Sequence, residues 1–232
     1  MAFSTLSSMV PAIALVLALA VLWGSSIAEA LSSPPRKVLV TGASGRTGKI
    51  VFSLLKENPS YSTVGLVRSE ASAKKLMKNV DCDLDQLFVS DVAAVPEDGE
   101  DVPQLLKGAD AMVICTSAVP RISKMSVLKQ ILKIPLNVVR RKPPLYFRGF
   151  RFHYAEGQNP EMVDYEGQKR QVDLAKKLGI KHVVVVSSMG GTDPDNFLNS
   201  IGKDKDGNGD GDILLWKRKA EKYLVEVSLS FH

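Results

Sequence analysis

The sequence has few cysteines, one long stretch without basic residues and another without acidic residues. Only Cys82 and Cys115 occur in 232 residues, which excludes a disulfide framework and any zinc site with cysteine spacing, so both are predicted to be free thiols. No lysine or arginine precedes Arg36, and no aspartate or glutamate lies between Asp110 and Glu156. With 45% hydrophobic and 24% charged residues, the chain has the composition of one globular domain with a sizeable core.

The first thirty residues read as a targeting segment. Residues 10–23 form an uncharged run rich in Ala, Leu and Val, shorter than the ~20 residues of a membrane-spanning helix. Ala28 and Ala30 fit a small-x-small cleavage site, although the usual positive residues before the run are missing. Residues 1–30 are therefore predicted to be a signal peptide, with an uncleaved membrane anchor or an organelle transit peptide as alternatives. Residues 31–36 follow as a linker.

The two thiols bear on the destination of the chain. Free thiols fit poorly with an oxidising exterior. A secretory or membrane-anchored protein is the first expectation from residues 1–30. A route through a signal peptide into a plastid is the alternative that reconciles the thiols with that segment.

A glycine-rich turn stands between an apolar run and a helical pattern. Residues 37–41 look like a buried strand, and Gly42, Gly45 and Gly48 follow with the spacing G-x-x-G-x-x-G. From Thr47 onward the apolar residues recur at helical spacing. Strand, glycine turn and helix together predict a dinucleotide site, because the turn lets the backbone approach a pyrophosphate and the helix N-terminus offers N–H groups to it. The alternative is a tight turn without a ligand.

Strands and helices then alternate along the chain. The patterns predict strands at 37–41, 63–68, 86–90, 111–116 and 182–188, and helical segments from 47 and at 70–78, 103–107, 161–178 and 213–225. This order predicts an α/β fold over residues 37–226: a doubly wound, mostly parallel Rossmann sheet of about five strands with helices on both faces. Ligands in such folds bind beyond the carboxyl ends of the strands.

Arg68 ends the second predicted strand. A carboxylate there would favour NAD, whereas a cation accommodates the 2′-phosphate of NADP. Arg46, inside the glycine turn, offers a second guanidinium to the same phosphate. Glu70 competes but lies two residues further on. We therefore expect NADP(H) as the cofactor rather than NAD; the alternative is that both arginines are solvated surface residues.

Several motifs together resemble the atypical short-chain dehydrogenase/reductases of plants and algae, the NAD(P)-binding, NmrA-like proteins. The resemblance covers residues 36–226 and rests on segments 41–48, 66–68, 116–120, 163–169, 187–192, 199–202 and 213–221. It implies that adenine lies near Asp91 and nicotinamide near Thr116, Ser117 and Ser188. The predicted cofactor residues are Gly42, Ser44, Gly45, Arg46, Thr47, Gly48, Arg68, Asp91, Thr116 and Ser117.

The catalytic residues implied by the resemblance are incomplete. Tyr165 and Lys169 spell Y-x-x-x-K, but in that superfamily the pair follows the fifth strand, and here it precedes it. After the fifth strand Lys219 takes the lysine position, with Leu215 where the tyrosine acid belongs. Ser188 is expected to polarise a carbonyl oxygen and Lys219 to hold the nicotinamide ribose. Two functions stay open: an oxidoreductase acting on an unknown carbonyl substrate, and a non-catalytic NADP(H)-sensing or scaffold protein that docks on a membrane or protein partner.

Residues 121–160 form a basic insertion. An amphipathic helical pattern runs to Pro135, and Pro143 and Pro144 break it. Three roles are open: docking of residues 121–151 on an anionic membrane surface, a lid over the cofactor, and a solvated face packed on the domain. No motif supports nucleic-acid binding.

Two further segments are weaker signals. Residues 204–210, inside a Gly/Asp-rich loop at 189–212, match the first half of a calcium-binding EF-hand loop, but Leu215 stands where calcium needs a bidentate Glu. We expect a solvated acidic loop and no metal. The family resemblance is lost at about Val227, so residues 227–232 read as a divergent tail, able to form a short strand, of an apparently truncated family member.

Overall fold

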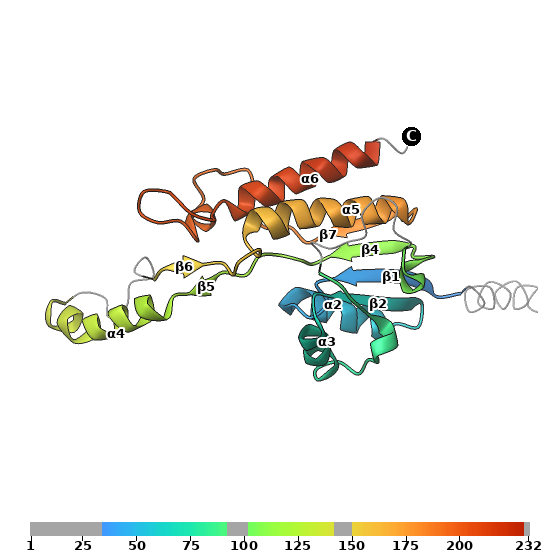
Figure 1. Ribbon diagram of the computed structural model, residues 1–232, viewed down its shortest axis with the longest axis horizontal. Coiled ribbons are helices and arrows are strands. Elements are labelled where there is room, and N and C mark those ends of the chain that lie inside the picture. Colours follow the sequence, from blue (N-terminus) through green and yellow to red (C-terminus); the bar gives the residue numbers. More distant parts are fainter. Residues whose placement is uncertain (1–33, 92–101, 142–149, 230–232) are drawn as a thin grey trace, which may run out of the picture. The chain divides into compact units, whose positions relative to one another are not determined.

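The computed structural model of the protein describes residues 34–91, 102–141 and 150–229. Its centre is a sheet of five parallel strands in the order β3-β2-β1-β4-β7 (Figure 1). The strands are β1 (Arg36–Thr41), β2 (Tyr61–Val67), β3 (Leu87–Val89), β4 (Ala111–Ile114) and β7 (His182–Val185). Mainly apolar, β-branched sequences form them, as expected for strands that are covered on both faces.

The strand order reverses next to β1. The chain runs outward from β1 through β2 to β3 and then returns to the other side of β1 with β4 and β7. Val38 pairs with Thr63 of β2 on one side and with Ala111 of β4 on the other. The loops that leave the carboxyl ends of β1 and β4 therefore diverge, and in open parallel sheets this is where ligands bind.

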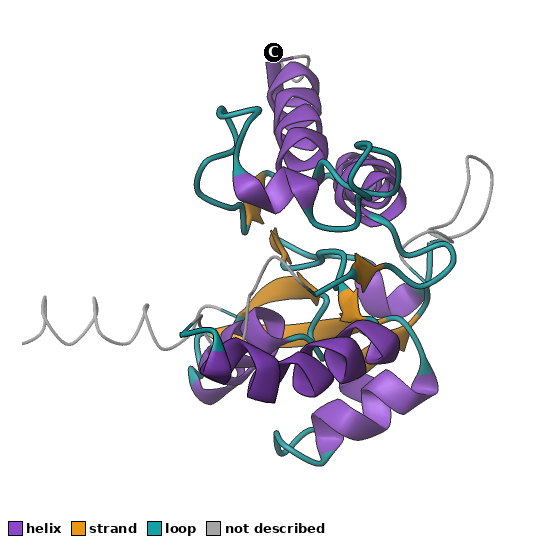
Figure 2. Ribbon diagram, turned by 90° about the vertical axis from the view of Figure 1, so that its left-hand side faces the viewer, coloured by secondary structure: helices purple, strands orange, loops and turns teal. Residues whose placement is uncertain are grey.

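Helices cover both faces of the sheet (Figure 2). On one face α2 (Arg46–Glu57) and α3 (Glu70–Met77) bury Phe52 and Leu76 against alternate residues of β1. On the other face α5 (Gly167–Lys177) places Val172 in a second cluster, and α6 (Ile213–Leu229) packs at its edge. The predicted doubly wound α/β fold is confirmed.

Some predicted elements differ from those of the structure. The strands predicted at 111–116 and 182–188 end at Ile114 and Val185, because the chain turns away there to form loops at the edge of the sheet. The long helix predicted at 161–178 begins as a π-helix, η5 (Glu161–Glu166), and continues as α5. The N–H of Gly167 donates to the carbonyl of Met162, five residues back, which widens this turn.

The structure of the basic segment also differs from the one predicted by its sequence pattern. Helix α4 (Lys124–Val139) continues through Pro135 instead of stopping there. A proline removes one N–H and therefore one bond to the preceding turn, and the N–H of Arg140 still donates to the carbonyl of Leu136 beyond it. Two short strands flank the segment as an antiparallel pair, β5 (Arg121–Ile122) and β6 (Phe152–His153), which periodicity did not predict.

The remaining elements are short 3-10 helices: η1 (Leu84–Gln86), η3 (Gln104–Leu106) and η6 (Phe197–Ser200). Helix α6 extends to Leu229, so residues 227–229 are helical and do not form the short strand considered above. Cys82 lies in the loop after α3 and is buried in the cluster that contains Leu76, and both cysteines are free thiols.

The targeting segment predicted at 1–30 lies outside the described residues, and so do the proline pair at 143–144 and residues 230–232. Within the part of the chain that the structure describes, none of the helices has both the length and the apolar composition needed to cross a membrane.

Candidate active site

The glycine turn between β1 and α2 is built by close backbone packing. Gly42 adopts φ +63°, a conformation that side chains disfavour. A Cβ on Gly48 would lie 2.2 Å from the carbonyl oxygen of Gly42, and one on Gly45 would lie 3.0 Å from the same oxygen. The three glycines therefore hold the start of α2 against the end of β1, and larger residues would push the helix away.

The N-terminus of α2 has the features of an anion site. Gly45 caps the helix without a side-chain hydrogen bond, and the first turn carries no acidic residue. Among the described residues, the backbone N–H groups of Arg46, Thr47 and Gly48 find no acceptor. Such N–H groups, aligned with the helix dipole, attract phosphate. The turn thus fits the pyrophosphate of a dinucleotide.

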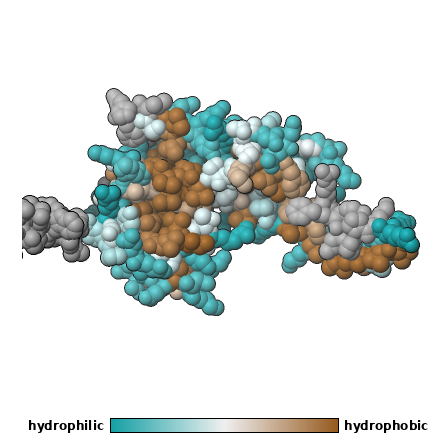
Figure 3. Space-filling view, turned by 180° about the vertical axis from the view of Figure 1, so that it is seen from behind, coloured by the Kyte–Doolittle hydropathy of each residue, from teal (hydrophilic) through white to brown (hydrophobic). Residues whose placement is uncertain are grey.

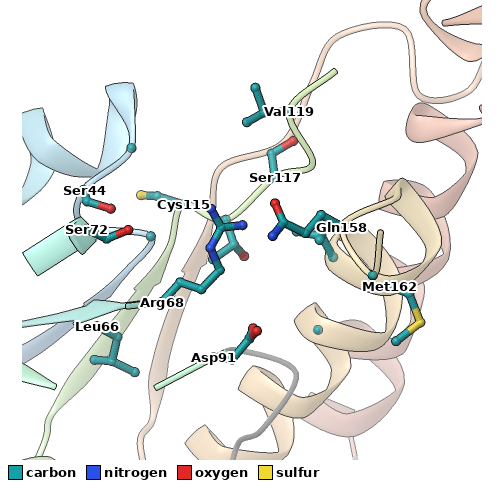
Figure 4. Close-up of a pocket in the computed structure, with 16 residues that line it drawn as sticks. Ser44, Leu66, Arg68, Ser72, Asp91, Cys115, Ser117, Val119, Gln158 and Met162 are labelled. Atoms are coloured by element: carbon teal, nitrogen blue, oxygen red, sulfur yellow. The ribbon is translucent and has the colours of Figure 1, made fainter. Parts of the chain in front are cut away.

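A cleft opens beyond the carboxyl ends of β1, β2 and β4 (Figure 4). Arg68, the residue after β2, reaches toward its middle between Cys115 and Gln158. Burial raises the pKa of the Cys115 thiol, which therefore stays protonated at neutral pH. The cleft is lined by Gly42, Ser44, Gly45, Leu66, Arg68, Ser72, Asp91, Cys115, Thr116, Ser117, Val119, Gly157, Gln158, Met162, Val163 and Gly167.

The loop after β4 is fixed by buried polar side chains. The N–H of Ala118 donates to Asp164 Oδ2 at 3.0 Å, and Asp164 Oδ1 lies 2.8 Å from Lys217 Nζ. Asp164 is fully buried and Lys217 is nearly so. Gln171 Nε2 donates to Thr116 Oγ1 at 3.0 Å and to the carbonyl of Gly167 at 2.9 Å. These contacts tie residues 116–118 to η5, α5 and α6, and Thr116 and Ser117 of this loop line the cleft.

The structure brings most of the predicted cofactor residues together. Gly42, Ser44, Gly45, Arg68, Asp91, Thr116 and Ser117 line the cleft. Arg46, Thr47 and Gly48 form the first turn of α2 beside it. The prediction from the carboxyl ends of the strands thus selected residues that are neighbours in space, although they come from four separate segments of the chain.

The predicted catalytic residues are placed elsewhere. Ser188 is an exposed residue of the loop after β7, and Lys219 is an exposed residue of α6. Neither is among the residues that line the cleft. Lys219 Nζ lies 4.0 Å from the ring centre of Trp216, a cation–π contact. The roles of Ser188 and Lys219 therefore remain predictions.

Tyr165 and Lys169, the Y-x-x-x-K pair, also take part in surface packing. Tyr165 packs its ring against Trp216 of α6, with ring centres 5.7 Å apart. Lys169 Nζ lies 5.2 Å from the ring centre of Tyr165 and forms an ion pair with Glu166 at 3.7 Å. Neither residue lines the cleft. The pair therefore packs η5 against α6. This structural role fits a pair that precedes the fifth strand, where the catalytic pair of the superfamily is not expected.

The acidic loop is closed by its own hydrogen bonds. Asp204 Oδ1 accepts from the N–H groups of Asp206 and Asn208, each at 2.9 Å. Lys203 pairs with Gly209 across the loop and forms an ion pair with Asp212 at 2.6 Å. Within residues 34–91, 102–141 and 150–229, acidic, histidine and cysteine side chains form no group suited to a metal ion.

Sequence reasoning missed the far wall of the cleft. Gly157, Gln158 and Met162 line it from the segment around the start of η5, and the Asp164–Lys217 pair supports it. A buried acid needs a partner, but residues 161–166 contain three acids, and nothing in the sequence indicates that Asp164 is the buried one. No pattern in the sequence identified Lys217 as that partner.

Comparisons with known proteins agree with this geometry. The family model described as NAD(P)H-binding matches residues 42–231. Sanguinarine reductase from Eschscholzia californica is 42% identical over 205 residues, covering 86% of this chain and 68% of the reductase. A chloroplastic, uncharacterised protein of Arabidopsis thaliana is 37% identical over 207 residues, covering 89% of this chain. The chain spans only 54% of the Arabidopsis protein's length.

The solved structures support the fold. A Bacillus halodurans protein, assigned as an NAD-dependent epimerase/dehydratase, superposes with a TM-score of 0.53 at 23% identity, covering 83% of this chain and 66% of that one. The family match extends over most of the chain, and the glycine turn and the cleft have the form that a dinucleotide requires. The chain therefore belongs to the NAD(P)H-binding family, as an atypical short-chain dehydrogenase/reductase with a Rossmann fold.

Proposed function

We propose that this protein binds NADP(H) in preference to NAD(H) and uses it in an oxidoreduction of a small carbonyl compound. The observation that carries the cofactor preference is Arg68, which lines the cleft directly after β2. Glu70, the carboxylate closest to it in sequence, begins α3 and is not among the lining residues. At the end of β2 the residue in the cleft is thus a guanidinium and not a carboxylate, which favours the 2′-phosphate; Asp91, the carboxylate among the described lining residues, follows β3 instead.

The described residues fit the parts of this cofactor. The N–H groups at the start of α2 would hold the pyrophosphate, and Arg68 with Arg46 would hold the 2′-phosphate. Asp91 would lie near the adenine end, with Thr116 and Ser117 at the nicotinamide end. The Gln171 amide donates to Thr116 Oγ1 and so orients that hydroxyl at this end of the cleft.

NADPH, when bound, supplies a hydride. The residues of the chain must then orient the substrate and provide a proton to its oxygen, so that a carbonyl becomes an alcohol. Ser188 is proposed to polarise that oxygen and Lys219 to contact the ribose, which requires both side chains to approach the cleft on binding. The proton would come from water, because Leu215 occupies the position of the usual tyrosine.

The cofactor preference is tested by calorimetric titration of the protein with NADPH and with NADH. Replacing Arg68 by alanine is expected to weaken NADPH binding by roughly 10- to 100-fold, since a charged hydrogen bond contributes about 1.5–3 kcal/mol, and to leave NADH binding unchanged. Arg36→Ala is the matched control, because Arg36 is also exposed but lies at the amino end of β1. Equal affinity of the wild-type protein for both cofactors would refute the preference.

A second candidate is an NADP(H)-binding protein without turnover, which senses the cofactor or acts as a scaffold. It is favoured by the make-up of the cleft: among the described lining residues there is no tyrosine, lysine or histidine to transfer a proton. NADPH oxidation is to be followed with a panel of carbonyl compounds and with sanguinarine, the compound in the relative's name. Wild-type turnover of any of them would exclude the sensor. Activity that appears only in Leu215→Tyr would indicate that the protein is an inactive relative of an enzyme and lacks only the usual tyrosine.

The location is proposed to be a plastid. The word chloroplastic in the name of the Arabidopsis relative supports this alternative, and so do the two free thiols. The signal peptide or membrane anchor at 1–30, with a secretory destination, stays a prediction. A fluorescent protein fused after the full chain distinguishes these locations, and fluorescence spread through the cytosol would contradict both.

A further inference from the structure

Helix α4 has its polar and apolar sides reversed relative to a helix packed on a protein core. Ser126 and Gln130 are its buried residues, with 6% and 7% of their surfaces exposed. By contrast, Met125, Leu128 and Leu132 are 61%, 49% and 69% exposed. A helix that only covers its own domain turns its apolar side inward. This helix presents that side to the outside.

The exposed apolar side is continuous. At about 100° per residue, the exposed side chains fall within one arc and follow the helix for about four turns. Figure 3 shows the resulting hydrophobic surface along this segment. Its members are Met125, Leu128, Ile131, Leu132, Leu136, Val138 and Val139, each at least 48% exposed. We call these seven residues the apolar stripe.

Basic residues border the stripe. Lys129, Lys133 and Arg140 are exposed along one of its edges, as their helical spacing places them. Arg121 and Lys124 precede them, and no acidic residue occurs between Asp110 and Glu156. The segment therefore combines a hydrophobic surface with positive charge that no acid of the same segment balances.

Two of the roles open from the sequence fit poorly with this arrangement. A solvated face packed on the domain would expose the polar side, whereas Ser126 and Gln130 are buried. A lid would bring residues of α4 to the cleft, and the described lining residues come from other segments. A second copy docked through a two-fold axis would place two copies of this segment against one another, and neither copy of the segment carries an acid to pair with Lys129 and Lys133.

We propose that α4 docks in the plane of an anionic lipid surface, with the apolar stripe in the acyl boundary and the basic residues at the headgroups. An amphipathic helix with cations at its borders has the properties of an interfacial helix, and anionic lipid supplies the opposite charge that the segment lacks. An anionic lipid surface both covers the stripe and pairs with the cations.

The test is flotation of the full chain with vesicles of phosphatidylcholine alone or mixed equally with phosphatidylglycerol. Binding is expected to the mixed vesicles and to weaken as salt rises. Leu132→Asp is expected to lower the partition coefficient by at least about 10-fold, the effect of withdrawing one leucine from an apolar phase. Lys129→Glu with Lys133→Glu is expected to lower it by at least about 30-fold, since each lost cation alone costs roughly fivefold and each new carboxylate is repelled by the anionic lipid.

Matched controls separate α4 from the rest of the chain. Leu54→Asp alters an equally exposed leucine of α2, at 62% exposure, and Lys74→Glu with Lys75→Glu makes the same charge change on α3. Both are expected to float like the wild type, and residues 10–23 are unchanged throughout. The proposal is overturned if the α4 variants float like their controls, or if binding is equal on pure phosphatidylcholine.

A second copy remains a defined outcome of the same experiment. Sedimentation equilibrium without lipid measures self-association of the wild type and of Leu132→Asp. A wild-type dimer that this substitution converts to a monomer, together with no flotation of the wild type, would assign the stripe to a protein interface instead.

Discussion

Replacing Lys217 by methionine is expected to destabilise the fold strongly, although the change removes a single ammonium group. Lys217 Nζ lies 2.8 Å from Asp164 Oδ1, and the two side chains are 7% and 0% exposed. Asp164 Oδ1 accepts no hydrogen bond from the other described residues. The variant therefore leaves a buried carboxylate with no cation.

Burial determines the magnitude. A surface ion pair contributes about 0–1 kcal/mol, whereas breaking a buried pair by removing one partner costs about 3–5 kcal/mol. We expect the loss to fall in the second range for Lys217→Met. In Asp164→Asn the amide oxygen still accepts from the N–H of Ala118, so combining the two substitutions should cost less than the sum of the single changes.

The assay is urea unfolding followed by far-ultraviolet circular dichroism, with NADPH titration of the same samples. Lys222→Met is the control, because Lys222 is an exposed lysine of the same helix and its loss should change stability by less than about 0.5 kcal/mol. NADPH affinity should fall in Lys217→Met, because Asp164 also fixes Ala118 in the cleft loop. Equal unfolding midpoints for the Lys217 and Lys222 variants would refute the reasoning.

Two further predictions concern other contacts. Gly48→Ala places a Cβ 2.2 Å from a backbone carbonyl and should lower NADPH affinity in a calorimetric titration, whereas Gly191→Ala, whose nearest contact is 3.8 Å, should bind normally. Burial alone would raise the pKa of the Glu221 carboxyl, but hydrogen bonds from Ser187 and Arg218 outweigh it and lower that pKa from 4.5. The wild type should therefore be more stable than Glu221→Gln above pH 4.5 and lose this advantage as the pH falls further; a difference in urea midpoint that stays constant across this range would contradict the assignment.

Much of the fold could be predicted from patterns among residues that are close in sequence. The strands that became β1, β2 and β4 are short apolar runs, and the glycine turn requires only residues close in sequence. Arg68 and Thr116 were selected because the carboxyl ends of parallel strands lie at one edge of the sheet. Residues that end different strands are therefore expected to be neighbours in space. This is why the cofactor side of the cleft could be outlined from the sequence.

Long-range contacts account for what was missed. The pairing of Asp164 with Lys217 joins η5 to α6, and periodicity reports only which face of a helix is apolar. Gln158 lines the cleft from a segment without a recognisable motif. Pro135 was expected to end α4. A proline removes one hydrogen bond and crowds the preceding turn, but the bond from Arg140 to Leu136 continues the helix beyond it.

The π-helix at residues 161–166 directs four consecutive side chains to three different surroundings. Met162 and Val163 line the cleft, Asp164 turns to its buried partners and Tyr165 packs on α6. Deleting one residue here would restore an ordinary α-helix and rotate the preceding chain by about 100° relative to α5. Apart from Asp164, the segment should therefore accept changes of residue type over evolution more readily than changes of length, because its residue count sets how the two walls of the cleft face each other.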